Sequence, residues 1–521
     1  MINRRRFLSY GLGVSAAGLA MACNKSVANN DEHSMHGMHG QAASNTGAMS
    51  HQNMDHSGHQ MGDMAGMNHA TNPDDLLPVQ ALPVGAALAA LPLLANESKQ
   101  AGKFTGRLTA KAHTLSLAKG VQSEFWLYNG VLGGPQIVVY EGDEVSIHFT
   151  NELKQETTVH WHGLPVPPEQ DGNPHDPVKP GQSLTYTFKL PQGCAGTYWY
   201  HTHAHELSAE QAFRGLAGTF IVKSRQDPMA DWPEQHWLFT DLRLDKNGKI
   251  PDNNMMDWMN GREGQFVLLN GQLQPKISIK TATRIRVWNA CNARYLKLHI
   301  PDCDIIVIGT DGGLLERPQA PVSELLIVPA ERYEIVLKPR KTGMLSLQNL
   351  PYNREKMMEK FTPVTLPLAQ IVYTASDKAL PKHLRNLPAF GKATAEHTVG
   401  FSEEMGAGLK QMFKVNGKTF DMQRIDATSK LGATEDWLVS NASHMDHPFH
   451  LHGTQFEIIE FIDSAESSKP AYRSLKDTVN LKPYQSVRVR CRQDFAGLRM
   501  FHCHILEHES LGMMGQVMVK A

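Results

Sequence analysis

"YNGVLGGPQIVVYEGDEVSIHFTNEL", residues 128–153, is the stretch that decides the fold. It opens on Asn-Gly, which favours a tight hairpin turn, and continues in short runs of alternating apolar and polar residues. "LNGQLQPKISIKTATRIRVWNACNA" (269–293) and "VNGKTFDMQRIDATSKLGATEDWLVSNAS" (415–443) begin in the same way. Each of the three repeats closes on an asparagine: Asn151, Asn289 or Asn441. The openings at Asn129, Asn270 and Asn416 lie 141 and 146 residues apart. Three copies at this period predict an all-β protein of three similar β-sandwich domains.

The composition excludes several classes of protein. The formal net charge of the 521 residues is −1, so no overall basic field indicates a nucleic-acid partner. Six cysteines are too few for a disulfide scaffold. Histidine (26) and methionine (24) are abundant, and both side chains bind metals.

The N-terminus predicts export. "NRRRFL" (3–8) and the weakly apolar run "GLGVSAAGLAMA" (11–22) are typical of a twin-arginine signal, which we place at residues 1–23. The run is too short to span a bilayer, and we expect no transmembrane segment elsewhere. The protein is therefore expected in the periplasm. It is either soluble there or anchored through a lipid on Cys23, which follows Ala22 directly.

Residues 24–80 form a tract rich in methionine and histidine, with seven of each between residues 31 and 69. The tract has almost no aromatic or β-branched residues, so we expect it to be disordered when free. Imidazole and thioether groups together suit copper, and methionine favours Cu(I). We interpret it as a copper-binding tract, with a flexible linker as the alternative. The three predicted domains then cover residues 81–225, 226–378 and 379–521.

Four histidine motifs follow the tract, two in the first repeat and two in the third. They are "HWHG", "YHTHAH", "HPFHLHG" and "HCHILEH", which begin at His160, Tyr200, His447 and His502. The middle repeat has no such motif, so we expect it to act as a spacer.

Strand geometry sorts these side chains into two groups. Side chains along a β-strand alternate between faces, so His502 and His504 point one way and Cys503 the other. The same parity gives a group of eight imidazoles, which is too many for one metal ion: His160, His162, His201, His203, His450, His452, His502 and His504. The other group contains His447, Cys503, His508 and Met513, the ligand types of a blue-copper electron-transfer site. The peptide around Cys503 would then connect the two sites.

The four motifs, in this order and spacing, resemble those of the multicopper oxidases, in the three-domain form of laccases and bacterial cuprous oxidases. The resemblance covers residues from about 100 to 521. It implies cupredoxin-like Greek-key sandwiches and four copper ions. It assigns His447, Cys503, His508 and Met513 to type 1 copper and His160 and His450 to type 2 copper. It assigns the type 3 pair to His162, His201, His203, His452, His502 and His504.

Two acids are further candidates by this resemblance. Asp171 and Glu509 match the family's proton-relay carboxylates, although a turn aspartate and a solvated glutamate are the simpler interpretations. His205 has no role that the motifs require, and we expect it to be exposed or to lie beside the ligands. Structural zinc is the alternative metal, but its usual Cys-x-x-Cys or His-x-x-x-His spacing does not dominate here.

The expected activity is four-electron reduction of O2 to water, coupled to one-electron oxidation of a small donor. An axial methionine suggests a modest potential, and the Met/His-rich tract suggests Cu(I) as the donor and a role in copper tolerance. Laccase-like oxidation of phenols and copper sequestration without turnover are the alternatives.

Two features remain open at this stage. No methionine-rich insert is present in the third repeat, since residues 376–412 contain only Met405 and Met412. Methionines elsewhere could form a Cu(I) entry site or could simply pack in the core: Met255, Met256, Met259, Met357 and Met358. Cys291 and Cys303 could form a disulfide after export, and Cys194 and Cys491 have no assigned role.

Overall fold

The computed structural model describes residues 71–521, apart from residues 405, 407 and 465. It confirms the predicted all-β class, because β-strands connected by loops and a few short helices make up the described chain. The predicted export signal (1–23), the possible lipid site at Cys23 and the Met/His-rich tract up to residue 70 lie outside the described residues.

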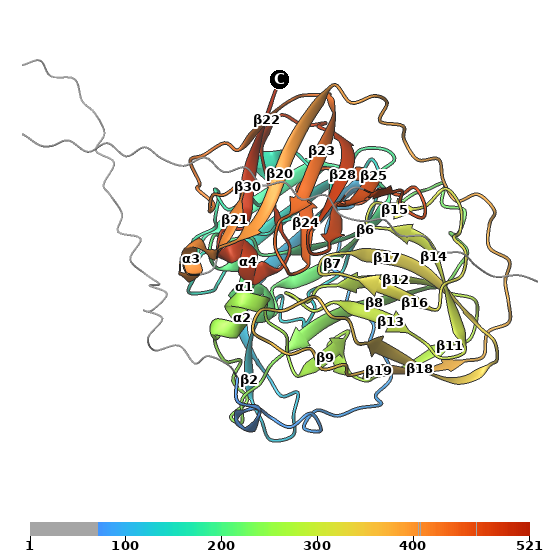
Figure 1. Ribbon diagram of the computed structural model, residues 1–521. Helices are drawn as coiled ribbons and strands as arrows, with labels where there is room; N and C mark the ends of the chain where they lie inside the picture. Colours follow the sequence, from blue (N-terminus) through green and yellow to red (C-terminus); the bar gives the residue numbers. More distant parts are fainter. Residues whose placement is uncertain (1–70, 405, 407, 465) are drawn as a thin grey trace, which may run out of the picture. The chain divides into compact units, whose positions relative to one another are not determined.

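The strands form six sheets, which group into three consecutive pairs along the chain (Figure 1). We call these pairs the first, second and third β units. No strand of the described chain crosses the domain boundaries predicted after residues 225 and 378, and these boundaries stay predictions.

The first unit contains the sheets β2-β1-β4-β5 and β3-β7-β6. Its strands are β1 (Lys103–Leu115), β2 (Ser123–Tyr128), β3 (Ile137–Tyr140), β4 (Glu144–Asn151), β5 (Ser183–Lys189), β6 (Gly196–His201) and β7 (Ala217–Lys223).

The second unit contains the sheets β10-β9-β8-β12-β17-β14-β15 and β11-β19-β18-β13-β16. Its strands are β8 (Glu234–Leu242), β9 (Phe266–Leu269), β10 (Gln272–Leu273), β11 (Lys276–Ile279), β12 (Arg284–Asn289), β13 (Leu296–His299), β14 (Cys303–Thr310), β15 (Gly313–Leu314), β16 (Glu324–Ile327), β17 (Arg332–Pro339), β18 (Gly343–Leu350) and β19 (Leu366–Tyr373).

The third unit contains the sheets β21-β20-β23-β28-β25-β26 and β22-β30-β29-β24-β27. Its strands are β20 (Ala395–Glu403), β21 (Phe413–Val415), β22 (Ala427–Lys430), β23 (Thr434–Asn441), β24 (His447–Leu451), β25 (Phe456–Asp463), β26 (Glu466–Ser468), β27 (Thr478–Leu481), β28 (Gln485–Arg492), β29 (Gly497–Cys503) and β30 (Met514–Lys520).

The same two parallel pairings recur in every unit. The strand that starts the unit pairs in parallel with the strand that ends the repeat: β1 with β4, β8 with β12, and β20 with β23. A second parallel pair joins the other sheet: β3 with β7, β11 with β19, and β22 with β30. Parallel neighbours cannot be joined by a hairpin, so the chain crosses between the two sheets, as it does in a Greek-key sandwich.

The Asn-Gly pairs that open the repeats make the same turn three times. The asparagines have φ of 53°, 50° and 51°, and the glycines after them 70°, 76° and 73°, the left-handed values of a type I′ turn. Each asparagine side chain also accepts a hydrogen bond from, and donates one to, the strand that starts its unit. The backbone partners are Thr109 and Arg107 for Asn129, Leu238 and His236 for Asn270, and Gly400 and Thr398 for Asn416.

The asparagines that close the repeats are equivalent too. Asn151, Asn289 and Asn441 are buried. Each accepts a hydrogen bond from the backbone N–H two residues ahead and donates to a distant carbonyl, that of Val178, Ile327 or Leu481. Since buried polar groups need such partners, these residues hold a loop in place in every unit.

Apolar side chains from facing sheets fill the units and the contact between the first two. Phe149, Trp161 and Phe220 belong to the core of the first unit. Trp199 of the first unit and Trp288 of the second pack in one shared cluster, and the Trp288 indole N–H donates to the carbonyl of Tyr198. The first two units are therefore joined by buried apolar surface.

Residues 71–80, which the sequence assigned to the disordered tract, pack against the second unit. The Leu77 N–H donates to the Leu244 carbonyl, and Leu76 forms a bridge with Asp245. The Thr71 hydroxyl accepts hydrogen bonds from Arg243 and from Asn254, the residue before helix α2 (Met255–Asn260). The sequence missed this segment because its few apolar residues, such as Leu76 and Leu77, are not periodic.

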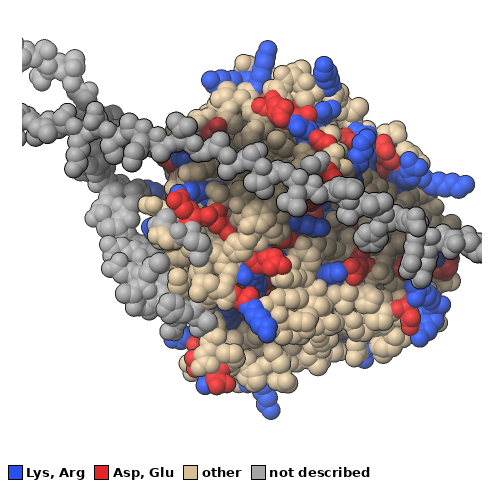
Figure 2. All heavy atoms as spheres, viewed as in Figure 1, with Lys and Arg blue, Asp and Glu red and all other residues tan. Residues whose placement is uncertain are grey.

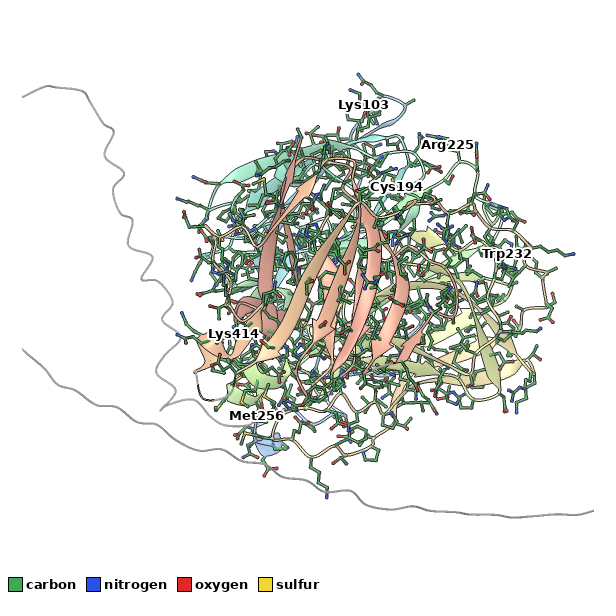
Figure 3. The ribbon with its side chains drawn as sticks, turned by 45° about the horizontal axis from the view of Figure 1, so that its top comes forward. Lys103, Cys194, Arg225, Trp232, Met256 and Lys414 are labelled. Atoms are coloured by element: carbon green, nitrogen blue, oxygen red, sulfur yellow. The ribbon has the colours of Figure 1, made fainter. Side chains whose placement is uncertain are left out.

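The possible Cys291–Cys303 disulfide is not formed. All five cysteines of the described chain are free and buried, including Cys194, which is labelled in Figure 3. Cys291 follows β12, whereas Cys303 begins β14. Burial raises the pKa of the Cys303 thiol to about 12, so it remains protonated at neutral pH.

The face shown in Figure 2 mixes lysine and arginine with aspartate and glutamate, in keeping with the small net charge of the chain. No helix among the described residues is both long enough and apolar enough to cross a membrane.

The Asn-Gly turns differ in burial, which gives a test of their contribution to stability. Asn270 is buried, whereas Asn129 and Asn416 are exposed. We expect Asn270→Ala to lower the free energy of unfolding by about 2–4 kcal/mol, because several buried backbone groups lose their partner. Asn416→Ala should cost roughly 1 kcal/mol, because water can replace the amide. Chemical denaturation of both variants measures the difference, and equal losses would contradict this account.

Candidate metal centres

In the third unit, pairing of β24 with β29 produces the predicted division of side chains. His450 lies directly opposite His502, and Phe449 lies opposite Cys503. Directly opposed residues of antiparallel strands point to the same face. His450 and His502 therefore share one face, and Cys503 points away from it.

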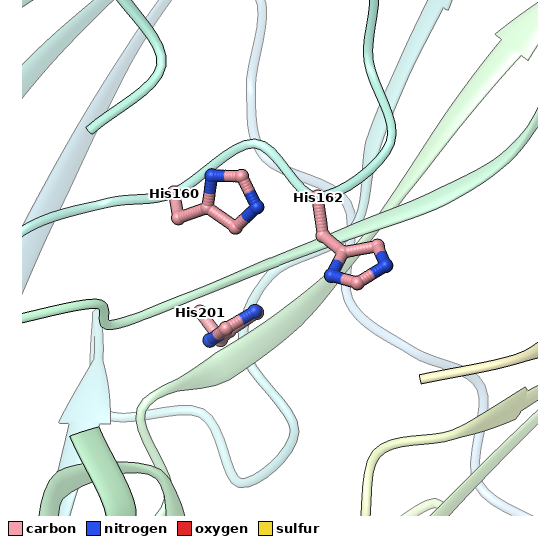
Figure 4. Close-up of side chains that lie close together, drawn as sticks. All are labelled: His160, His162 and His201. Atoms are coloured by element: carbon pink, nitrogen blue, oxygen red, sulfur yellow. The ribbon is translucent and has the colours of Figure 1, made fainter. Parts of the chain in front are cut away.

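In the first unit, a single bridge brings the other two motifs together. The N–H of His160 donates to the carbonyl of His201 at 2.7 Å, and the reverse bond measures 3.1 Å. The rings of His160, His162 and His201 face a common space, with centroids 5.3–5.7 Å apart (Figure 4).

Histidines of the first and third units interleave in one buried cluster. The rings of His160 and His452 stack with centroids 3.8 Å apart, and those of His162 and His450 do the same. The ring centroids of His504 and His162 are 4.9 Å apart. All eight predicted side chains are fully buried: His160, His162, His201, His203, His450, His452, His502 and His504.

Backbone carbonyls fix the orientation of four of these rings. A carbonyl can only accept a hydrogen bond, so the Nδ1 beside it carries the proton and Nε2 has a free lone pair. The four pairs are His160 with Asp171 (2.9 Å), His201 with Thr202 (2.7 Å), His450 with Asp477 (2.8 Å) and His502 with Cys503 (2.9 Å). Nε2 of His160, His201 and His450 is buried without any partner.

His162 is turned the other way. Its Nε2 lies 3.0 Å from Asp477 Oδ1, while its Nδ1 is buried without a partner. An ionised carboxylate accepts only, so Nε2 carries the proton and Nδ1 has the free lone pair. Every ring with an assigned orientation thus has one unprotonated nitrogen available as a ligand.

Three nitrogens converge at one point of the cluster. Nε2 of His502 lies 3.1 Å from Nε2 of His452 and 3.2 Å from Nε2 of His203. Burial lowers the pKa of all three rings, that of His502 to about 3, so they are neutral. Neutral imidazoles with facing nitrogens fit a bound cation, because neutral imidazole is the form that ligates metals.

A second, separate site forms around Cys503. Its Sγ lies 3.4 Å from Nδ1 of His447 and 3.8 Å from Nδ1 of His508, and these two nitrogens are 3.4 Å apart. All three side chains are fully buried. Burial raises the pKa of the free Cys503 thiol, and a bound metal ion would deprotonate it.

The outer nitrogens of both imidazoles at this site have acceptors. His508 Nε2 lies 3.2 Å from the carbonyl of Met259, and its ring stacks on Phe413 at 4.0 Å. His447 Nε2 lies 3.0 Å from Glu403 Oε1. Both Nδ1 atoms are therefore free on the Cys503 side. Met513 is buried beside them, and its carbonyl accepts from the Cys503 N–H.

The two candidate acids are buried at the edge of the histidine cluster. Asp171 Oδ2 lies 3.1 Å from Nδ1 of His452. Glu509 Oε1 is 3.8 Å from Nδ1 of His203, and its other oxygen accepts from the Ser208 hydroxyl. Burial raises the pKa of Glu509 to about 8, so its carboxyl is mostly protonated at neutral pH. Neither residue is a solvated side chain, and both can hold a proton or orient a ring. His205 lies outside the cluster and contacts Phe420.

Sequence reasoning missed Asp477, Arg332 and Glu403. These residues belong to no histidine motif. Asp477 lies 315 positions from His162, Arg332 lies 145 positions from Asp477, and Glu403 lies 44 positions from His447. No local pattern could have identified them. Gly163 of "HWHG" is a partial signal, because a Cβ there would lie only 2.2 Å from Asp477 Oδ2.

Comparison with known proteins agrees with these sites. Two family models described as multicopper oxidase match residues 109–227 and 394–521. A solved structure entitled "Multicopper oxidase from Campylobacter jejuni: a metallo-oxidase" superposes with a TM-score of 0.85 at 46% sequence identity. The match covers 87% of this chain and 99% of the other.

Two curated relatives extend the comparison. A multicopper oxidase of Staphylococcus aureus is 32% identical over 78% of this chain and 88% of its own length. A laccase of Bacillus subtilis is 26% identical over 75% of this chain and 89% of its own length. The residues matched by the two family models contain the histidines of both candidate sites. The chain therefore belongs to the multicopper oxidase family, a family of oxidoreductases that use copper.

Proposed function

We propose that this protein is a cuprous oxidase of the periplasm that contributes to copper tolerance. Four Cu(I) ions would be oxidised to Cu(II) for each O2 that is reduced, with four protons, to two waters. The observation that carries the proposal is a helix with several methionines, α2, packed against His508 at the Cys503 site.

Helix α2 places methionine residues beside this site. The carbonyl of Met259 contacts His508 Nε2, and Met259 itself is buried. Met255 and Met256 on the same helix are half-buried, and Met256 is labelled in Figure 3. The Asn260 side chain bonds both backbone groups of Met357. Two methionine segments that are about 100 residues apart in sequence therefore meet beside His508, and thioethers favour Cu(I).

The start of α2 is fixed where the Met/His-rich tract joins the described chain. Asn254 and Asp257 form a capping box, and Asp257 is paired with Arg243. Asn254 and Arg243 also bond the hydroxyl of Thr71. A copper-binding tract is thus attached to the chain at the helix that carries the methionines. Its attachment would keep the local concentration of donor high.

The proposed ligands follow the family pattern. His447, Cys503, His508 and Met513 would hold type 1 copper, and His160 and His450 type 2 copper. His162, His201, His203, His452, His502 and His504 would hold the type 3 pair, which gives four copper ions. Bound there, copper would supply one-electron oxidation of the donor at the first site and reduction of O2 at the cluster.

The protein itself supplies connection, orientation and protons. Cys503 lies between His502 and His504 in the chain, so one peptide segment links the two sites covalently. Glu509 is mostly protonated and lies beside His203, which suits a proton donor, and Asp171 orients His452.

Oxidation of phenols is the second candidate, and one cavity favours it. A cavity of about 480 Å³ is lined by Tyr295, Tyr352 and Phe361, among others. The two tyrosine rings stack at 5.4 Å, and the Tyr352 hydroxyl donates to Asp446, next to His447 in the chain. Aromatic side chains in the lining suit stacking with an aromatic donor. Laccase is the name of the Bacillus subtilis relative.

Oxygen uptake by the copper-loaded protein tests the proposal. Cu(I) and a methoxyphenol would be supplied in parallel, to the full chain and to a variant without residues 24–70. We expect faster uptake with Cu(I), and about a tenfold fall without the tract at limiting Cu(I), because tethered capture raises the local concentration. Faster O2 uptake with the phenol, unchanged by the deletion, would favour laccase-like oxidation of phenols as the function. Copper binding without uptake would favour sequestration.

Replacement of the helix methionines tests the entry site. We expect Met255→Leu/Met256→Leu to raise KM for Cu(I) about tenfold, equivalent to about 1.4 kcal/mol of lost binding, because leucine keeps the shape but lacks sulfur. The rate with the phenol should not change. Met344→Leu, at an exposed methionine of β18, is the matched control. An unchanged KM would show that α2 does not receive the copper.

A further inference from the structure

We infer that Asp477, fixed by Arg332 of the second unit, is the positioning residue that turns His162 so that Nδ1 faces the cluster. This role extends the proposed function, because it concerns assembly of the copper cluster which that function requires. It also gives the second unit, predicted from sequence to be a spacer, a direct part in the site.

His162 needs a different kind of partner from the rings oriented by carbonyls. Backbone carbonyls hold His160, His201, His450 and His502 through Nδ1, which leaves Nε2 free. In His162 the nearest partner is a side-chain carboxylate, which lies 3.0 Å from Nε2. The Thr478 hydroxyl lies 3.3 Å from the same nitrogen and donates its own proton to Asp477 Oδ1, so it leaves the carboxylate as the charged acceptor. Asp477 therefore decides which nitrogen of His162 is free.

Both oxygens of the Asp477 carboxylate accept hydrogen bonds from neighbouring side chains. Oδ1 lies 3.0 Å from His162 Nε2 and 2.7 Å from Arg332 Nη1. Oδ2 accepts from Arg332 Nη2 at 2.5 Å and from Gln455 Nε2 at 2.8 Å. The carbonyl of the same residue holds His450. One residue of the third unit thus orients rings from both the first and the third units.

Arg332 makes this buried carboxylate possible. Asp477 is fully buried, and a buried carboxylate needs an ion pair and hydrogen bonds to offset its lost hydration. Arg332 comes from β17 of the second unit, and its other donors bond the carbonyls of Thr197 and Ala330. The guanidinium is therefore held by the first and second units while it pairs with the third.

The first unit also leaves room for this ion pair. A Cβ at Gly163 would lie 2.2 Å from Asp477 Oδ2 and 2.8 Å from Arg332 Nη2. Gly163 also has a φ of 80°, a region that favours glycine. The residue directly after His162 thus lets both charged groups approach the ring.

Asp477→Asn tests the inference, because an amide has only one acceptor oxygen. When the amide oxygen takes the place of Oδ2, where it accepts from Arg332 Nη2 and Gln455 Nε2, the amide NH2 takes the place of Oδ1 and faces His162. His162 must then accept at Nε2 and carry its proton on Nδ1. The nitrogen needed for copper is then blocked. We expect copper affinity at the cluster to fall about 10–100-fold, as for other residues that orient metal ligands. The coupled-pair absorption should be lost while the blue copper–thiolate absorption remains.

Glu334→Gln is the matched control. Glu334 is another fully buried carboxylate, paired with Arg284 and Arg286 and bonded to Thr197, and its partners include no histidine. Copper content, electron paramagnetic resonance and both absorption bands would be measured after reconstitution. Loss of the pair signal in Asp477→Asn alone supports the inference. Equal signals in both variants, whether kept or lost, would overturn it.

Arg332→Lys serves if Asp477→Asn does not fold. Lysine keeps a positive charge but lacks the two parallel donors, so we expect a partial loss of the pair signal with the blue band intact. An unchanged pair signal would overturn the inference. Failure of the proposed function is a separate result: the natural protein would contain the full copper cluster but consume no O2 with Cu(I).

Discussion

The structure depends on holding eight imidazoles in one buried space, where the rings with an assigned orientation turn an unprotonated nitrogen inward. Facing lone pairs have no hydrogen bond to offer one another, and their burial removes water as a partner. The protein meets this constraint from outside the cluster. Backbone carbonyls and two carboxylates, those of Asp171 and Asp477, lie against the outer nitrogens. The sandwiches serve to hold these acceptors in position.

Much of this arrangement could be predicted from local sequence because strands have a period of two. Alternation alone separated Cys503 from His502 and His504, and the repeated Asn-Gly pairs predicted three related units. The buried asparagines show why the repeat was recognisable: Asn151, Asn289 and Asn441 perform the same backbone bonding in each unit. Because the same hydrogen bonds are made at the equivalent position of each unit, the same residue type recurs there in the sequence.

The rest could not be predicted, because it depends on contacts between distant segments. Nothing around Asp477 or Arg332 indicates that they meet, since they are 145 positions apart and belong to different units. The packing of residues 71–80 on the second unit and of α2 beside His508 likewise depends on tertiary contacts, which the local sequence does not show. The Cys291–Cys303 pairing stayed open for the same reason: spacing does not establish whether two thiols meet, and the structure shows both free. Breaking a buried pair such as Arg332–Asp477 typically costs about 3–5 kcal/mol, yet the pair leaves no local signature.

Gly163 shows that one position of the "HWHG" motif serves the packing between units and not copper binding. "HWHG" contains two histidines of the cluster, so it is naturally understood as a copper-binding signature. Its glycine has no side chain to offer a metal, and this missing side chain makes room for Asp477 and Arg332, which come from the other two units. The glycine at the fourth position of the motif is therefore required by the packing between the units. A chain with both histidines but a larger residue at this place would keep its ligands and lose the close fit between its domains.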